Sequence, residues 1–188
     1  TYLKSYAYVD GFGRGREVQV PSPYQADTRI VSVTRYNNRG MVTGASTPMY
    51  NAAAAGSGIL NPEIAAMPSY TATYYDTLDR LSATVQFGGG TEMWRTTNTY
   101  YGDRVKVDPP AGGDTVTYTD VYGRTTKIEE YTSTTAHQDT TYAYPNAATD
   151  PQLRITDPAG KVTSFTSDLA GRRTQLVDPN AGTATYTY

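Results

Sequence analysis

Asp120-Val121-Tyr122-Gly123-Arg124 is the stretch that decides the fold of this chain, because its pattern, Asp-x-x-Gly-Arg, recurs along the sequence. Complete copies begin at Asp10 and Asp168, and looser copies lie at 37–40 and 76–80. A short unit repeated along a chain indicates a repeat architecture. The functional question is therefore what a sheet made of such units is for.

The composition of the motif predicts a tight turn between two strands. Asp accepts hydrogen bonds from backbone N–H groups two residues on, and Gly allows positive φ without a steric penalty. Tyr6 and Tyr8 precede the first motif with strand spacing, so they share one face of a strand. Phe165 and Ser167 are interpreted as the equivalent pair before Asp168. Strands that alternate with period two follow at 17–20, 125–128 and 174–177.

A second kind of turn follows these strands. Asp157-Pro158-Ala159-Gly160 has Pro and Gly where a type I turn prefers them, and 178–182 is a version one residue longer. Two strands and two turns fill a unit of roughly 20 residues and leave no room for a helix. We therefore predict an all-β fold of consecutive antiparallel β-hairpins that form a curved, spiralling sheet. The prediction is a single segment over 1–188 with a loop insertion at about 45–69.

The insertion departs most from the repeat, since it is rich in Ala, Gly and Pro. A short helical turn is expected near 62–66, because Pro is favoured at a helix start. Its apolar residues are expected to pack against the sheet: Met41, Met49, Ile59, Leu60, Ile64 and Met67. Two further departures are a compressed turn at 101–104 and a longer Pro-containing loop at 144–151.

Composition limits the possible partners. The net charge of −2 provides no basic field for nucleic acid or anionic lipid. The absence of Cys excludes disulfides and thiolate metal sites. No apolar run approaches the length of about 20 residues that a membrane helix needs. The sequence starts and stops within the pattern, so we expect a fragment of a longer protein.

The recurring residues favour a structural role over a chemical one. An active site is needed once, whereas a turn is needed in every unit, so Asp and Arg are interpreted as turn residues. The 18 tyrosines are expected to stack between hairpins as a ladder, and exposed Tyr platforms for sugars are the alternative. His137 is expected in a surface loop, Glu129 and Glu130 as a solvated pair, and 88–90 as a hairpin connection. The sequence predicts no enzyme, with no catalytic residue, cofactor or metal ligand.

These features resemble the YD-repeat, or RHS-repeat, family. The resemblance rests on Thr185-Tyr186-Thr187-Tyr188, on the Asp-x-x-Gly-Arg turn, and on short strands that end in Asp-Pro-x-Gly. It is closest over 115–188, looser over 1–44 and 70–107, and absent over 45–69. The sequences at 101–104 and 109–113 are similar to those of secreted actinobacterial members.

The resemblance implies a function as well as a fold. In this family the repeats wind as a spiral sheet into the wall of a hollow shell, which in bacterial members encloses a C-terminal toxin. Animal relatives serve cell-surface adhesion. The implied partners are neighbouring repeats and a toxin cargo, and the implied location is secreted or at the cell surface. Many members cleave themselves at Asp-Pro-x-Gly-Leu, but Lys161 follows Gly160 here, so that activity is not carried over. Glycan binding and homo-oligomers formed through open strand edges are the alternatives.

Overall fold

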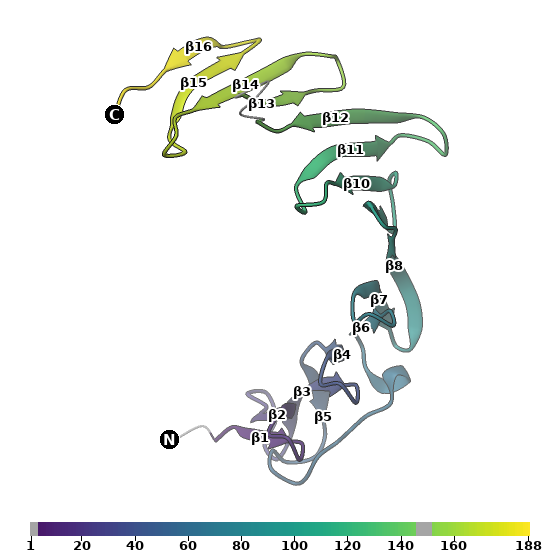
Figure 1. Cartoon of the computed structure of the whole chain (residues 1–188). Helices are drawn as coiled ribbons and strands as arrows, with labels where there is room; N and C mark the ends of the chain where they lie inside the picture. The colour runs from purple at the N-terminus through teal and green to yellow at the C-terminus, as the bar shows by residue number, and fades with distance from the viewer. Residues whose placement is uncertain (1–3, 146–151) are drawn as a thin grey trace. The chain divides into compact units, whose positions relative to one another are not determined.

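The chain is all-β, as predicted, and consists of consecutive antiparallel hairpins (Figure 1). The computed structural model describes residues 4–145 and 152–188. The predicted loop at 144–151 therefore lies largely outside the described residues. The contacts divide the chain into two compact units, Thr1–Thr97 and Asn98–Tyr188, which we describe separately.

The strands of the first unit are hydrogen-bonded in chain order, except for one short strand beside β3. Thr, Val and Tyr are frequent in these strands, as a pleated, half-buried environment favours. The order is β1-β2-β3-β4-β6-β7-β8, and β5 pairs with β3. The bounds are β1 (Tyr6–Val9), β2 (Gly15–Pro21), β3 (Arg29–Tyr36), β4 (Val42–Ser46), β5 (Met49–Asn51), β6 (Tyr70–Tyr75), β7 (Leu81–Gly88) and β8 (Thr91–Tyr100), whose last residues cross into the second unit.

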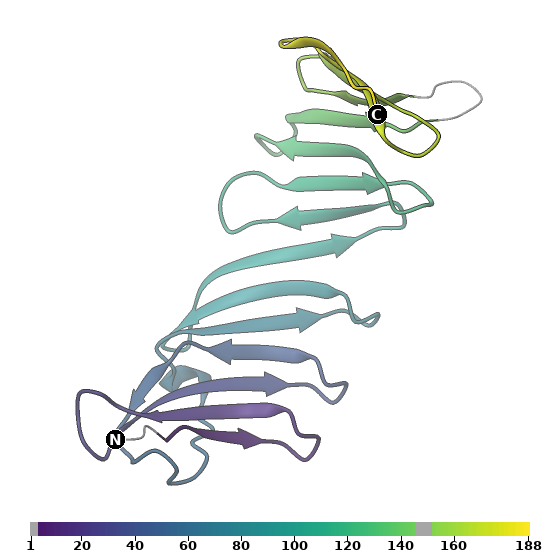
Figure 2. The same ribbon diagram turned by 90° about the vertical axis from the view of Figure 1, so that its left-hand side faces the viewer.

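The second unit repeats the same construction (Figure 2). Each strand pairs antiparallel with the strand before it, from β9 to β16. The bounds are β9 (Arg104–Asp108), β10 (Thr115–Thr119), β11 (Thr125–Tyr131), β12 (His137–Ala143), β13 (Gln152–Thr156), β14 (Val162–Ser167), β15 (Arg173–Asp178) and β16 (Gly182–Thr185).

The alternating strand direction gives each unit two rims, where the connections lie. Successive hairpins turn at opposite ends of an antiparallel sheet, so every second connection falls at the same end. In the first unit, the turns at 10–14, 37–41 and 76–80 therefore share one rim. In the second unit, the turns at 120–124 and 168–172 share one rim. We call this end of each unit the Asp-turn rim, and the other end the opposite rim.

The insertion covers one face of the first sheet and closes its core. Met49 and Met67 are buried against Val31 and Val85, and Leu60 and Ile64 pack around them. The expected helical turn forms at Ile64–Ala66, as a 3₁₀ helix (η1). Ile59, in contrast, is half exposed, so its predicted packing is wrong. We call residues 45–69 the strap.

The predicted equivalence of Phe165 with the paired tyrosines is also wrong. Tyr8, two residues before Asp10, pairs with Glu17 on the face that the strap covers. The residue two before Asp168 is Thr166, whereas Phe165 pairs with Leu153 and Leu176. Because side chains alternate along a strand, a shift of one position moves Phe165 to the other face.

Candidate functional site

The repeated turn is one hydrogen-bonded structure that recurs at six places. In each, one side-chain oxygen of the first residue accepts the backbone N–H groups two and four positions on, at 2.8–3.0 Å. The N–H of that first residue donates to the carbonyl four positions on at 2.8–2.9 Å. The first residues are Asp10, Asn37, Asp76, Asp120, Asp157 and Asp168. The motif therefore makes a turn, as predicted, and the second kind of turn at Asp157 has the same geometry.

Arg completes the turn at four of these sites. Its Nε and Nη2 lie 2.6–2.8 Å from the second carboxylate oxygen of the turn Asp. One oxygen of the Asp therefore accepts backbone N–H groups, and the other accepts the guanidinium. Position four of the turn takes positive φ, which Gly supplies everywhere except at Asp79, with φ of 63°. Asp79 instead forms an ion pair with Arg39 of the neighbouring turn.

These contacts lower the pKa of four turn carboxyls, those of Asp10, Asp76, Asp120 and Asp168. At Asp168, the backbone N–H of Arg172 is the largest cause, partial desolvation opposes it, and the Arg172 side chain adds to it. The pKa of Asp76 is lowered for the same reasons by Arg80. These four aspartates are therefore acceptors that stay ionised, a state suited to holding a loop and unsuited to general acid chemistry at neutral pH.

The same Arg side chains connect one hairpin to the next. The guanidinium of Arg14 lies 4.7 Å from the ring centre of Tyr36, and that of Arg124 lies 4.4 Å from Tyr144. Arg172 lies 4.9 Å from Tyr188. At these three places the contact between hairpins is a cation–π contact of Arg with Tyr, and not the direct stacking of Tyr on Tyr that the sequence analysis expected.

A buried carboxylate fastens the strap to the sheet. Glu17 of β2 is 2% exposed, and its oxygens accept the N–H groups of Leu60 at 2.9 Å and Asn61 at 3.2 Å. Gln19, fully buried, donates to the Gly58 carbonyl at 2.8 Å and accepts the Gly56 N–H at 2.9 Å. The segment thus has its backbone polar groups satisfied by the sheet, as a segment packed on a sheet face requires.

A second polar cluster lies between β11 and β12, and the sequence analysis missed it. Glu129 was expected to be solvated, but it is 6% exposed, so that expectation is wrong. Lys127 Nζ lies 2.5 Å from one of its oxygens, and the Tyr131 hydroxyl donates to the other at 3.1 Å. The bond from Lys127 lowers the pKa of Glu129 against the effect of burial. Glu130 points to the exposed face, as adjacent strand residues must.

His137 joins this cluster from the first position of β12. It is exposed as expected, but it lies in a strand and not in a loop. Its Nδ1 lies 2.5 Å from Asp139, so ligand atoms of Glu129, His137 and Asp139 come within 4.8 Å of one another. The Lys127 ammonium lies between the two carboxylates, 3.8 Å from Asp139, and supplies the positive charge that a metal ion would bring. Lys127 and Glu129 are two positions apart on β11, and His137 and Asp139 are two positions apart on β12. This spacing in the sequence could have indicated that the four side chains form a cluster.

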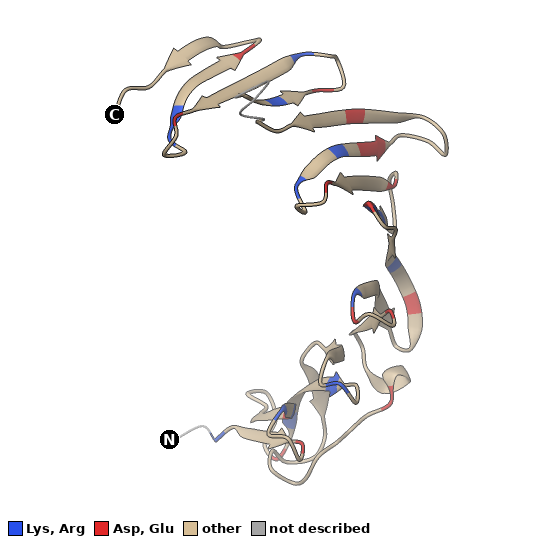
Figure 3. Cartoon of the chain, in the orientation of Figure 1, with Lys and Arg blue, Asp and Glu red and all other residues tan. Residues whose placement is uncertain are grey.

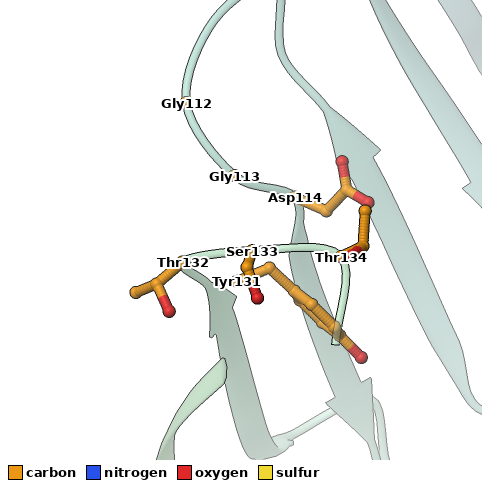
Figure 4. Close-up of a pocket in the computed structure, with 7 residues that line it drawn as sticks. All are labelled: Gly112, Gly113, Asp114, Tyr131, Thr132, Ser133 and Thr134. Carbon is orange, nitrogen blue, oxygen red and sulfur yellow. The ribbon is translucent and has the colours of Figure 1, made fainter. Parts of the chain in front are cut away.

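The pockets of the described surface are shallow and do not gather reactive groups. One hollow of about 470 Å³ lies between the loops at 112–114 and 131–134 (Figure 4). Its Ser133 hydroxyl accepts backbone N–H groups of its own loop, and its Asp114 pairs with Lys106 at 2.6 Å. A second hollow of about 630 Å³ is lined by Asp120, Tyr122, Arg124, Thr126, Tyr142, Tyr144 and Pro145.

The charged side chains are mixed along the ribbon, with acidic and basic residues adjacent at the turns (Figure 3). This arrangement gives no extended basic surface of the kind that nucleic acid needs. Within 4–145 and 152–188, no helix has the length and apolar character to cross a membrane.

Comparisons with known proteins agree with this geometry. The RHS Repeat family matches residues 148–183. The solved structure of TcdB2-TccC3 without its hypervariable C-terminal region matches 99% of this chain with a TM-score of 0.60 and 14% identity. The structure of TcdB2-TccC3 matches 94% with a TM-score of 0.58 and 13% identity. This chain spans 12% and 11% of the length of those two chains, and no curated protein sequence matches it. The family match thus shows an RHS repeat at 148–183, and the repeated turn and the hairpin order show the same construction in the other described parts of the chain.

Proposed function

We propose that this chain is a wall segment of an RHS-repeat shell that encloses or presents another part of a longer, secreted bacterial protein. The observation that carries the proposal is the hairpin-by-hairpin sheet in which the described residues form the same turn at six places, five that begin with Asp and one that begins with Asn37. A sheet of this kind can be extended by further hairpins, because each hairpin pairs only with its neighbours. The repeated residues are used in holding the turns, and this supports a role in containment rather than catalysis.

The similarity in fold to TcdB2-TccC3 supports the proposal that this chain is part of a shell wall. Nearly the whole chain follows that fold, yet it covers about an eighth of the larger chain. A segment of this size is too small to enclose a folded domain, so containment requires further repeats. The proposed cargo is a C-terminal toxin domain of the same polypeptide.

The test is to examine the full-length parent protein by electron microscopy and limited proteolysis. A hollow particle with this segment in its wall is expected. The enclosed domain should resist protease until the wall is opened by mild denaturant, while an exposed domain fused to the outside serves as the control. A solid particle, or digestion of the C-terminal domain at the same rate as the control, would reject the proposal.

A second candidate function is glycan or cell-surface recognition. The observation that favours it is the 630 Å³ hollow, in which three tyrosines surround a paired Asp and Arg. Aromatic faces beside polar groups suit sugar rings, but Arg124 already covers one face of Tyr122 and of Tyr144. A glycan array with the wild-type chain and Tyr122→Ala tests it, with Tyr24→Ala as an equally exposed control. Binding that Tyr122→Ala abolishes supports this function, and an array without signal removes it.

The strand edges offer the chain a route to self-association. β1 and β16 each have one hydrogen-bonded neighbour. Residues 182–188 carry no charge, and Thr and Tyr dominate them. Such an edge readily accepts another strand. Replacing Thr185 with Pro removes an N–H from this edge and should weaken association by this route, as sedimentation would show.

A further inference from the structure

The face of β2 and β3 beneath the strap carries three buried polar side chains that point at the strap backbone. Glu17, Gln19 and Arg29 are each at most 4% exposed. A buried polar side chain is costly unless a partner satisfies it, and here the partners belong to the strap. A face that served only to pack against apolar residues would carry apolar residues itself. These three side chains therefore form a built polar site, and the strap occupies it.

The first half of the site binds the backbone around two glycines. The Gly56 N–H donates to Gln19 at 2.9 Å, and the Gly58 N–H donates to the Tyr8 hydroxyl at 3.1 Å. The Gly58 carbonyl accepts from Gln19 at 2.8 Å and from Arg29 at 2.7 Å. Each of these four bonds ends on a main-chain atom of the strap. The sheet thus binds this segment as a protein binds a peptide, through its backbone.

The second half of the site continues along the same segment. The N–H groups of Leu60 and Asn61 donate to Glu17, and the Arg35 guanidinium donates to the Pro62 carbonyl. The Leu60 side chain packs against the core of the first unit and provides an apolar anchor. A few polar groups that fix orientation, together with an apolar anchor, are the usual components of a ligand site.

The glycines restrict which peptide fits. Gly56 and Gly58 have φ of 87° and 117°, which other residues rarely adopt. A Cβ on Gly56 would lie 2.6 Å from the ring of Tyr6. The residues that follow the two glycines are exposed, so their identity is free. The site is therefore specific for a short peptide of the form Gly-x-Gly-x-Leu, in which Leu60 is the last residue.

The sheet does not depend on this segment for its connectivity. β4 and β6 pair directly on either side of the strap, with Ser46 opposite Tyr70. Met49 and Met67, the strap residues that are buried in the core, both lie outside 56–62. The segment that fills the site is thus separate from the residues that close the core.

We propose that the face of β1–β3 is a peptide-binding site, that residues 56–62 are its tethered occupant, and that a free Gly-x-Gly-x-Leu peptide binds there once the strap is released. The chemistry of the partner follows from the contacts that the strap makes. The site lies within the first unit, so the proposal stands independently of the shell and its cargo, and its failure would leave both untouched.

Gly56→Val/Gly58→Val in the 188-residue chain is designed to release the strap. Both positions have positive φ, and Val at the first also collides with the Tyr6 ring. The matched control is Gly11→Val/Gly102→Val, because those glycines have open space around them and no positive φ. Faster protease cleavage of the strap in the first variant alone, with an unchanged circular dichroism spectrum, establishes release.

Fluorescence anisotropy of a labelled peptide of residues 55–62, with blocked ends, measures binding. The opened chain should bind it at least about tenfold more tightly than the wild type or the control, in which the tethered strap competes at a high effective concentration. Ala in place of the peptide's first Gly should weaken binding at least about tenfold, because of the positive φ and the Tyr6 ring. Glu17→Gln in the opened chain should weaken binding to a similar extent.

A second opened chain does not depend on strained residues. Sequences for a site-specific protease are inserted after Ala54 and after Glu63, which are both exposed, and the folded chain is then cut at both. This cut chain should bind the labelled peptide as the first opened chain does. Absence of binding to both opened chains, with the sheet retained, overturns the proposal. Equal binding of the Gly and Ala peptides, or binding that Glu17→Gln leaves unchanged, also overturns it.

Discussion

Removal of the Glu17 carboxylate is the sharpest test of how the strap is held. In Glu17→Ala, the N–H groups of Leu60 and Asn61 lose their acceptor, and the Gln19 amide loses one of its two acceptors and keeps the Gly58 carbonyl. Hydrogen bonds to a charged group each contribute about 1.5–3 kcal/mol, and water replaces part of this at the exposed Asn61. We therefore expect a loss of about 3 kcal/mol in the free energy of unfolding of the first unit.

Urea titration followed by fluorescence measures this loss directly. Trp94 is the single tryptophan, and it pairs with Gln86 in the first unit. With a urea dependence of about 2 kcal/mol per M, the midpoint should fall by about 1.5 M. Protease should also cut the strap faster. Glu63→Ala removes an exposed carboxylate from the same segment and should leave the midpoint within about 0.3 M. Equal shifts in the two variants would refute the assigned role of Glu17.

Three further predictions concern the turns and the second unit. The four turn aspartates that pair with Arg have lowered pKa values, so their contribution to stability is complete above about pH 4 and is lost as the pH falls through those values. The urea midpoint should therefore drop in acid, and a flat profile from pH 6 to 2.5 would contradict this. Lys127→Met should raise the pKa of Glu129 and reduce stability by about 1–3 kcal/mol, measured by carboxyl NMR titration and thermal unfolding, with Lys161→Met as the unaffected control. Gly113→Ala would place a Cβ 1.5 Å from a backbone oxygen and should cost about 1–3 kcal/mol in thermal unfolding, whereas Gly102→Ala, with open space around it, should not.

The turn and the hairpin order were predictable because both depend on local chemistry. The Asp turn closes within five residues, so its acceptor, its positive-φ position and its Arg all stand together in the sequence. Asn37 shows how far this extends, since it makes the same turn without a carboxylate. The sequence alone therefore sufficed for the fold class and for the structural role of the motif.

The errors arose where contacts join distant residues or depend on register. Leu60 and Glu17 are 43 positions apart, so no local pattern reveals that they meet. Glu129 was interpreted as a solvated pair with its neighbour Glu130, although adjacent strand residues face opposite sides and its partners are Lys127 and Tyr131, two positions away on its own face. Phe165 was misplaced by one position. Because side chains alternate between the two faces of a strand, a shift of one position assigns Phe165 to the wrong face.

The self-sufficiency of each Asp turn has a consequence for how such proteins change length. Because every acceptor and donor of a turn belongs to the same five residues, a gene duplication that adds two strands leaves all other turns intact. It also returns the chain to the same end of the sheet, so each later turn stays on its own rim. A duplication of one strand would send every later motif to the wrong end. Repeat number in this architecture should therefore vary by whole hairpins.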